Sequence, residues 1–404
     1  MLALIAWRNV WRSKTRSLVL LSSIILGIWG GTFIMAFSWG MIEEYVGIAI
    51  SGQISHIQLH NPGYKKDKDI HFAINNPEKI VQQIRNTEHV KAVSMRSIVN
   101  GMVSTATTGT GVNINGIIPA DEDSLTHIGN HIIDGNFFAE TKHNQVVIGE
   151  KLAHKLNAKT GNKIVLTFQD KDNTITSGAF RVAGIFRTSN SSFDEMNIFV
   201  RSADFTPMIG LPGTAHEIAV LLQNNDALES VKNKLKKDNP ALLVESWKEI
   251  APELSVMIDS LGQKMYAFII IILLALGFGI VNTMLMAVLE RVREIGILMA
   301  VGMNKSRVFM MIMLETIYIA IIGGPIGILF AGLSIHYTGI SGINLSAFSK
   351  GLSSFGLGSV VHPALPVNEY LNILFLVIIT AFLAAIYPSI KALKLKPAIA
   401  IRKI

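Results

Sequence analysis

Four long apolar stretches constrain this chain more than any other feature. They cover residues 17–40, 266–289, 308–336 and 371–390. Each reaches the roughly 20 residues that an α-helix, rising ~1.5 Å per residue, needs to cross about 30 Å of hydrocarbon. Residues 41–265 contain no such stretch, and 16% of the whole chain is charged. The sequence therefore predicts a membrane protein with four transmembrane α-helices and a large extracytoplasmic domain between the first and second.

The distribution of Lys and Arg predicts the orientation of the chain. Basic residues cluster before the first span, between the second and third, and after the fourth: Arg8, Arg12, Lys14, Arg16, Arg291, Arg293, Lys305, Arg307, Lys391, Lys394, Lys396, Arg402 and Lys403. Short basic segments stay on the cytoplasmic side. Both termini are therefore expected in the cytoplasm and the domain at 41–265 outside. The net charge of +7 then indicates contact with anionic membrane lipid, and nucleic-acid binding is not expected.

The domain at residues 41–265 is predicted to be of α+β type with two subdomains. Strands are expected at 55–59, 92–99, 217–222 and 241–245, and helices at 77–86 and 226–237. Shorter alternating strands, including 163–168 and 179–187, occupy the middle. This order predicts one subdomain made of residues 41–110 plus 213–265, with a β-rich subdomain of residues 111–212 inserted into it.

The loop at residues 290–307 combines charge with apolar residues. Charges cost about +2.5 to +3.5 kcal/mol each at the centre of a membrane helix, so this loop must lie outside the hydrocarbon. A solvated loop that only sets topology is one interpretation. The apolar residues Ile295, Leu298, Met299 and Val301 favour another, in which a partner protein covers the loop. A push on such an element would pass directly into the adjoining membrane helices.

Sequence motifs for catalysis and metal binding are weak or absent. No Gly-Lys dipeptide occurs, so the chain lacks a phosphate-binding loop of the Walker A type, and no enzymatic activity is expected. His216-Glu217 resembles the start of a zinc motif, but Val220 occupies the position of the second ligand, so no metal site is expected. His56 and His60 are expected to be solvated residues at strand ends. The acidic run at residues 121–123 is expected to be a surface turn.

Glycine pairs and one acidic residue mark the predicted spans. Gly27 and Gly31, and likewise Gly323 and Gly327, are four residues apart, a spacing that lets helices approach closely. Packing within the chain and a dimer interface are both compatible with it. Glu315 is the acidic residue placed inside a span, near the cytoplasmic end. Snorkelling of its carboxylate toward the interface is favoured over a proton-relay role.

Three motifs in order resemble the permease subunits of FtsX/MacB/LolC-LolE type ABC transporters. The first is the loop motif, whose residues are Glu290, Arg291, Arg293, Glu294, Ile295, Gly296, Leu298, Met299, Ala300 and Gly302. The second is Leu314-Glu315, and the third is C-terminal, with Tyr387, Pro388, Lys391, Pro397 and Arg402. The resemblance implies that residues 290–307 hold a coupling helix that contacts separate cytoplasmic ATPase subunits. It also implies that those subunits bind ATP and Mg²⁺, that no cofactor binds this chain, and that a second permease pairs with it.

Within this family, the chain most resembles the LolC/LolE branch. Residues 51–58, 344–348 and 355–358 carry that resemblance. It implies an inner-membrane permease with a periplasmic domain that releases lipoprotein cargo to a periplasmic carrier by mechanotransmission. The hairpin turn near residues 169–178 is short and lacks proline, which leaves the identity of the subunit within a pair open. The alternatives are a tripartite efflux or export permease for drugs, peptides or siderophores, and a regulator of a cell-wall hydrolase.

Overall fold

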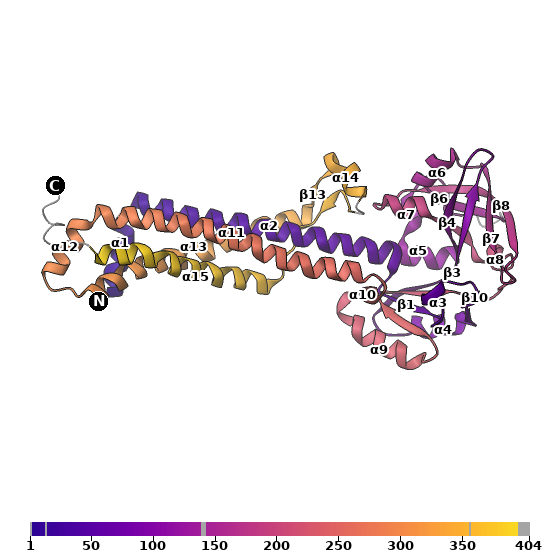
Figure 1. The fold of residues 1–404 in the computed structure, drawn as a ribbon, viewed down its shortest axis with the longest axis horizontal. Coiled ribbons are helices and arrows are strands. Elements are labelled where there is room, and N and C mark those ends of the chain that lie inside the picture. The colour runs from indigo at the N-terminus through magenta and orange to yellow at the C-terminus, as the bar shows by residue number, and fades with distance from the viewer. Residues whose placement is uncertain (1, 13, 139–142, 355–356, 395–404) are drawn as a thin grey trace. The chain divides into compact units, whose positions relative to one another are not determined.

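A computed structural model describes residues 2–12, 14–138, 143–354 and 357–394. The chain forms two compact units, whose elements are labelled in Figure 1. Unit 1 comprises Met1–Ile42, Ile258–Asn344 and Val360–Ile404, and unit 2 comprises Glu43–Met257 and Leu345–Ser359. Unit 1 contains the predicted spans, and unit 2 contains most of the predicted extracytoplasmic domain.

Four helices of the described chain are long and apolar enough to cross a membrane. They are α2 (Lys14–Ala49), α11 (Pro252–Glu290), α13 (Lys305–Ser341) and α15 (Val367–Leu393). Each predicted span lies inside one of them, which confirms the predicted fold class. Pro325 lies inside α13, and the helix continues through it. One further helix, α1 (Leu2–Arg12), was not predicted, because it is too short to show as a membrane span.

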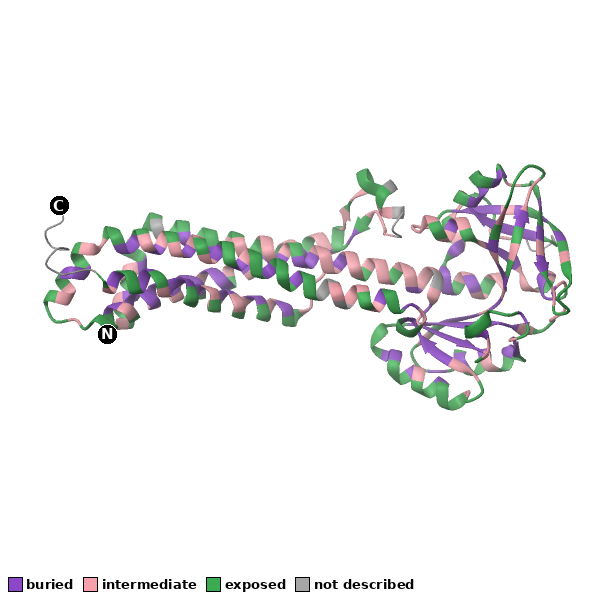
Figure 2. Cartoon of the chain, in the orientation of Figure 1, coloured by how far each residue is buried: buried purple, intermediate pink, exposed green. Residues whose placement is uncertain are grey.

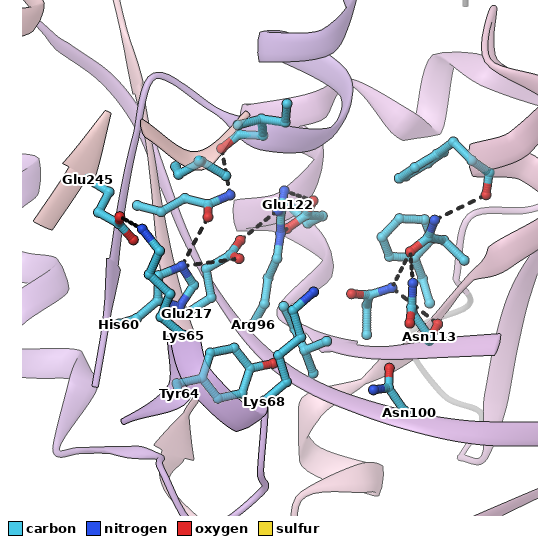
Figure 3. Close-up of a pocket in the computed structure, with 18 of the residues that line it drawn as sticks. His60, Tyr64, Lys65, Lys68, Arg96, Asn100, Asn113, Glu122, Glu217 and Glu245 are labelled. Atoms are coloured by element: carbon cyan, nitrogen blue, oxygen red, sulfur yellow. Dashed lines mark hydrogen bonds and ion pairs between the residues drawn. The ribbon is translucent and has the colours of Figure 1, made fainter. Parts of the chain in front are cut away.

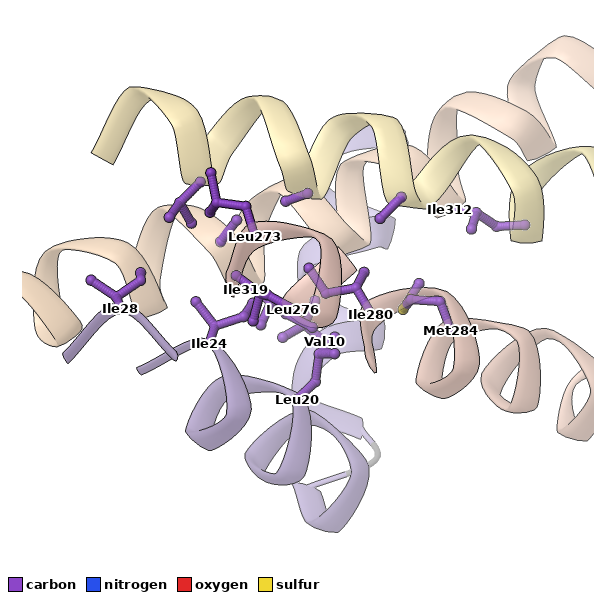
Figure 4. Close-up of a cluster of buried hydrophobic side chains, with 14 of the residues drawn as sticks. Val10, Leu20, Ile24, Ile28, Leu273, Leu276, Ile280, Met284, Ile312 and Ile319 are labelled. Carbon is purple, nitrogen blue, oxygen red and sulfur yellow. The ribbon is translucent and has the colours of Figure 1, made fainter. Parts of the chain in front are cut away.

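The core of unit 1 draws side chains from all five of these helices. Val10, Ile24, Ile280, Ile319 and Ala381 are each at most 5% exposed and belong to one hydrophobic cluster. Figure 4 shows the first four of these converging between the helices. Because α1 contributes Val10 to this cluster, the N-terminal helix is an integral part of the unit.

Large apolar side chains also cover the outward sides of these helices. Phe268, Phe278, Leu329 and Phe375 are all more than half exposed, and exposed residues run along each long helix in Figure 2. An apolar surface of this extent is unfavourable in water but matches the hydrocarbon of a bilayer. The burial pattern therefore agrees with the membrane assignment made from the sequence.

Unit 2 is built on one sheet of ten strands. The order is β12-β1-β11-β3-β4-β9-β6-β8-β5, and β7 pairs with both β3 and β8. The strands are β1 (Ile57–His60), β3 (Val90–Ser104), β4 (Gly109–Ile117), β5 (Ile132–Gly135), β6 (Gln145–Gly149), β7 (Lys163–Gln169), β8 (Ile175–Phe186), β9 (Asn197–Arg201), β11 (Glu217–Leu222) and β12 (Leu243–Ser246). Strand β3 is 15 residues long and pairs with β11 through its first part and with β4 and β7 through its second. The sheet is therefore continuous across the predicted division at residues 110–111, which falls inside β4.

Short helices and two minor strands complete unit 2. They are α3 (Tyr64–Asp67), α4 (Pro77–Arg85), α5 (Pro119–Thr126), α6 (Glu150–Leu156), α7 (Ser191–Met196), α8 (Ser202–Phe205), α9 (Leu228–Asp238), α10 (Trp247–Ile250), β2 (Ile74–Asn75) and β10 (Thr214–Ala215). Helix α4 buries Val81 and Ile84, and α9 buries Val231 and Leu235. This three- and four-residue spacing gives each helix one apolar face.

The segment between α13 and α15 has its own small structure. Strands β13 (Ile343–Asn344) and β14 (Val360–Val361) form an antiparallel pair, and α14 (Ser349–Ser354) lies between them in the sequence. Residues 355–356 lie outside the described part of the chain. Leu345–Ser359 groups with unit 2, which the predicted boundaries at 41 and 265 did not include.

Candidate functional site

The predicted coupling segment contains one short helix, α12 (Val292–Ala300). It follows directly on α11, which ends at Glu290, and α13 begins five residues after it, at Lys305. Two local features end α12 and start α13. Gly302 has φ +104°, a conformation that residues with a Cβ rarely adopt. The Asn304 side chain accepts a hydrogen bond from the Ser306 N–H and caps α13.

The residues of this segment divide between a buried and an exposed side. Ile295 and Gly296 are buried, and Met299 packs against the core of unit 1. Arg291 and Leu298 are half-buried, whereas Glu290, Arg293, Glu294, Ala300 and Gly302 are exposed. Two apolar side chains join the exposed side, Ile297 at 46% and Val301 at 84% exposure. One side of the segment is thus fixed to the unit, and the other presents mixed apolar and charged groups. Ile297 was absent from the predicted set, although it lies four residues from Val301.

Glu315 on α13 is buried and has partners on two other elements. The Asn9 Nδ2 atom of α1 donates to Glu315 Oε1 at 2.6 Å, and Arg291 Nη1 lies 3.5 Å from the same oxygen. Arg291 also donates from Nη2 to the Asn9 carbonyl at 3.2 Å. Glu315 is only 7% exposed. Asn9 and Arg291 therefore both contact the buried carboxylate within unit 1.

A second ion pair links α1 to α12. Arg12 Nη2 donates to Glu294 Oε1, and both side chains are about half exposed. Exposed pairs of this kind contribute about 0–1 kcal/mol, so the contact orients α12 more than it stabilises it. A cavity of about 410 Å³ lies between these groups, lined among others by Asn9, Arg12, Glu294 and Glu315. Sequence reasoning placed Arg12 only in the orientation argument, because nothing local in the sequence pairs it with position 294.

The glycine pairs lie at helix contacts inside unit 1. A Cβ built on Gly27 would lie 3.3 Å from Leu276, and one on Gly31 would lie 3.4 Å from Ile272, both on α11. Cβ atoms built on Gly323 and Gly327 would lie 3.0 and 2.9 Å from Ile24 and Ile28 of α2. All four glycines therefore face neighbouring helices of the same chain.

The C-terminal motif is described only in part. Pro388 is buried inside α15, whereas Tyr387 and Lys391 are exposed. Pro397 and Arg402 lie outside the described residues. Among the residues described here, Tyr387 and Lys391 are the members of the motif available at a surface.

Unit 2 contains a polar pocket of about 560 Å³ built around a buried arginine. Arg96 on β3 donates to Glu122 at 2.7 and 3.0 Å and to Glu217 at 2.8 Å. Figure 3 shows these groups with Tyr64 at one side and Asn100 and Asn113 at the other. Within the described chain, no group of three or more His, Cys, Asp or Glu side chains is arranged to hold a metal ion.

Two expectations about this region are wrong. Glu122 is 0% exposed and binds Arg96, so residues 121–123 are not simply a surface acidic turn. His60 is 8% exposed and bonds the His216 carbonyl at 3.1 Å and the Gln58 side chain at 3.0 Å, so it is not a solvated strand end. In both cases a long-range partner, invisible in the local sequence, makes burial of the polar group favourable.

The carboxylates beside Arg96 hold its guanidinium ionised. Burial alone lowers the pKa of Arg96, but the carboxylates of Glu122 and Glu217 outweigh it and raise that pKa above its ordinary value. Burial and the Glu217 charge raise the pKa of Tyr64, which therefore stays protonated. Burial lowers the pKa of His216 and favours its neutral form. The cluster is thus a fixed, charge-paired structural element.

Four apolar helices, with a mixed α/β domain inserted after the first, define a multi-pass membrane protein with an extracytoplasmic domain of periplasmic type. Residues 17–238 match the MacB-like periplasmic core domain, and residues 266–397 match the FtsX-like permease C-terminal domain. The chain belongs to the FtsX/MacB type of ABC transporter permeases. The matched domains are those of a non-catalytic transporter subunit.

Individual relatives are distant and differ in their stated roles. The pyoverdine export ATP-binding/permease protein PvdT of Pseudomonas syringae pv. syringae is 23% identical over 81% of this chain and 50% of its own length. The lipoprotein-releasing system transmembrane protein LolC of Buchnera aphidicola subsp. Schizaphis graminum is 24% identical over 70% of this chain and 74% of its own length. The crystal structure of the periplasmic region of MacB from Actinobacillus actinomycetemcomitans covers 52% of this chain and 95% of that chain, with 14% identity and a TM-score of 0.37. This chain spans about half the length of the pyoverdine exporters it matches.

Proposed function

We propose that this chain is the permease of a transporter in which separate ATPase subunits, binding ATP and Mg²⁺, drive movement of the extracytoplasmic domain. The observation that carries the proposal is the two-sided coupling segment. Its exposed side presents Ile297 and Val301 between charged residues, a mixture typical of a protein contact. Its buried side, through Ile295 and Gly296, is packed into the core of unit 1.

Movement of α12 would reach the membrane helices through named contacts. Glu294 is tied to α1 by Arg12, and Arg291 is tied to α1 and α13 by Asn9 and Glu315. Helix α11 continues from the coupling segment without a loop, since it ends at Glu290. A displacement of the segment by an ATPase would therefore act on α1, α11 and α13 together. A second permease chain, identical or homologous, is proposed to complete the assembly in the inner membrane, with both termini cytoplasmic.

Lipoprotein release to a periplasmic carrier is the proposed cargo reaction. Its support is the sequence resemblance at residues 51–58 and 344–348 and the LolC relative named above. Export of a siderophore or similar compound through a tripartite assembly is the second candidate, supported by the PvdT relatives. Regulation of a cell-wall hydrolase has no support from the relatives described here.

Surface variants of the coupling helix test the ATPase proposal. We would purify the full chain from its native host in mild detergent and identify the proteins that accompany it. The double variant Ile297→Glu, Val301→Glu changes only exposed side chains and should lose the ATPase. Met102→Glu, at an apolar position of unit 2 that is also exposed, is the control and should keep the ATPase. Recovery of the ATPase with the double variant would overturn the proposal.

The same preparation tests the cargo. A bound acylated lipoprotein, or a periplasmic carrier recovered with the chain, supports lipoprotein release. A membrane-fusion adaptor recovered in place of both supports the export alternative and refutes lipoprotein release.

A further inference from the structure

A groove of about 350 Å³ runs between α1, α2 and α13 in unit 1. Val10 and Trp11 of α1, Leu18 and Leu21 of α2, and Ile319 and Ile322 of α13 form its apolar lining, and Lys14 and Ser17 complete it. Val10 and Ile319 also reach the helix core, as Figure 4 shows. Trp11 is 49% and Leu18 58% exposed, so the groove opens to the surroundings of the helices.

Along α2, the residues that line the groove change from polar to apolar. Lys14 and Ser17 come first, and Leu18 and Leu21 follow. Seven residues separate Lys14 from Leu21, about 10 Å along a helix. This is the depth over which a phospholipid changes from headgroup to acyl chain. Lys14 lies at the polar end and is exposed, whereas the Ser17 hydroxyl already donates to the Val10 carbonyl.

We propose that this groove binds one anionic phospholipid, with the acyl chain against Leu18, Leu21 and Ile322 and the phosphate at Lys14. The charge of the groove lining indicates which class of lipid binds. Lys14 is the charged side chain among the described residues that line the groove, and no carboxylate of the lining offsets it. A basic side chain near a membrane surface favours anionic lipid by about five-fold in affinity.

A second copy of the chain fits this groove less well. In a two-fold contact the same surface of both copies is buried, so both Lys14 cations would lose solvent without a carboxylate of the groove lining to pair with them. A lipid phosphate supplies the opposite charge. Trp11, with its edge-to-face contact to Trp7 at 5.9 Å, also suits the interfacial region, where tryptophan is enriched.

Lipid titration of the full-length chain tests the site. Native mass spectrometry in detergent would compare phosphatidylglycerol with phosphatidylcholine of the same acyl chains. The expected result is tighter binding of phosphatidylglycerol, weakened about five-fold by Lys14→Gln, with phosphatidylcholine binding unchanged. Lys394→Gln removes a cation at the end of α15, outside the groove, and should leave both affinities unchanged. Equal binding of the two lipids, or an equal loss in Lys394→Gln, would overturn the proposal.

A second measurement locates the lipid independently of its charge. Phosphatidylglycerol brominated on the acyl chain should quench the fluorescence of Trp11, measured as the difference between the native chain and Trp11→Phe. Ile322→Trp fills the groove and should reduce the quenching of Trp11, measured here as the difference between Ile322→Trp and the double variant Ile322→Trp, Trp11→Phe, provided that circular dichroism shows unchanged helix content. Unchanged quenching in that folded variant would show that lipid lies elsewhere. If the native chain forms dimers and both Lys14→Glu and Ile322→Trp abolish them, the groove is an interface between copies. That result would refute the lipid site.

Discussion

Asn9 and Glu315 lie 306 residues apart in the sequence, yet the Asn9 amide donates to the Glu315 carboxylate at 2.6 Å. Arg291 approaches the same carboxylate oxygen and also bonds the Asn9 carbonyl. Helices α1 and α13 and the predicted coupling segment are thereby joined at one buried acid. A carboxylate within a span is costly unless it is paired, and this pairing is what keeps Glu315 in place.

Removal of the Glu315 carboxylate should destabilise unit 1. In Glu315→Ala, the side chain of Arg291 remains mostly buried without this acceptor, and breaking a buried pair costs about 3 kcal/mol. Glu315→Gln keeps an acceptor for Asn9 and should cost less. Thermal unfolding of the full chain in detergent measures both. Glu43→Ala, which changes an exposed acid on α2, is the control, and a melting temperature for Glu315→Ala equal to that of the control would contradict the prediction.

Gly302 should resist replacement because of its backbone. Its φ of +104° costs a residue with a Cβ roughly 1–2 kcal/mol. We expect Gly302→Ala to shift the end of α12 and to lower ATP turnover by the co-purified ATPase in nanodiscs. Gly47→Ala has no steric obstacle within 4 Å and should preserve turnover. Full turnover in Gly302→Ala would mean that the conformation at this residue is unimportant for coupling.

The contact between α2 and α13 should depend on Gly327. A Cβ there would lie 2.9 Å from Ile28, and overpacking of this kind costs about 1–3 kcal/mol. Gly332 lies on the same helix with nothing within 4 Å, so Gly332→Ala should be neutral or stabilising, because alanine favours helix. The comparison of the two melting temperatures tests the helix contact, and equal stability of the two variants would argue against it.

The sequence alone was sufficient to predict the elements that depend on neighbouring residues in the chain. The four spans follow from apolar length, and β11 begins and ends at Glu217 and Leu222, the bounds that the sequence predicted. The residues of the predicted coupling segment come from a motif, but the motif does not reveal which of them face the core. The burial of Glu122 and His60 and the partner of Glu315 depend on residues far away in the sequence, and periodicity contains no information on such pairs.

Loss of the Arg96 side chain should destabilise unit 2 strongly. Arg96→Met leaves the Glu122 and Glu217 carboxylates, 0% and 7% exposed as side chains, without their common partner, and this should cost about 3–5 kcal/mol. Adding Glu122→Gln and Glu217→Gln removes both negative charges and should restore most of the lost stability. Hydrogen exchange of the β3 and β11 amides in the full chain measures the effect. If the triple variant is less protected than Arg96→Met, charge pairing is not the main contribution of this cluster.

The stability of unit 2 should fall as pH rises from about 4 to 6 because of Asp194. This side chain is 2% exposed, and burial raises the pKa of its carboxyl to about 6, against the hydrogen bonds from Thr188. The folded state keeps the proton in this window while the unfolded state loses it, so the contribution of Asp194 is present below pH about 4 and lost above about 6.

The variant Asp194→Asn isolates this group. Relative to the native chain it should gain up to about 3 kcal/mol between pH 4 and 7, from a pKa difference of about two units. The measurement is hydrogen exchange of the α7 amides at each pH, corrected for intrinsic rates. A difference between the two chains that does not change with pH would contradict the raised pKa.

The continuity of the unit 2 sheet through β3 has a mechanical consequence. Strand β3 pairs with β11 at one end and with β4 and β7 at the other. The ladders of β11 and β4 overlap at one residue of β3, Arg96, which pairs with Glu217 of β11 and with Ile117 of β4. Strand β3 should therefore act as the connection between the two halves of the sheet, so that a force applied at β12 reaches β5 through the β3 backbone.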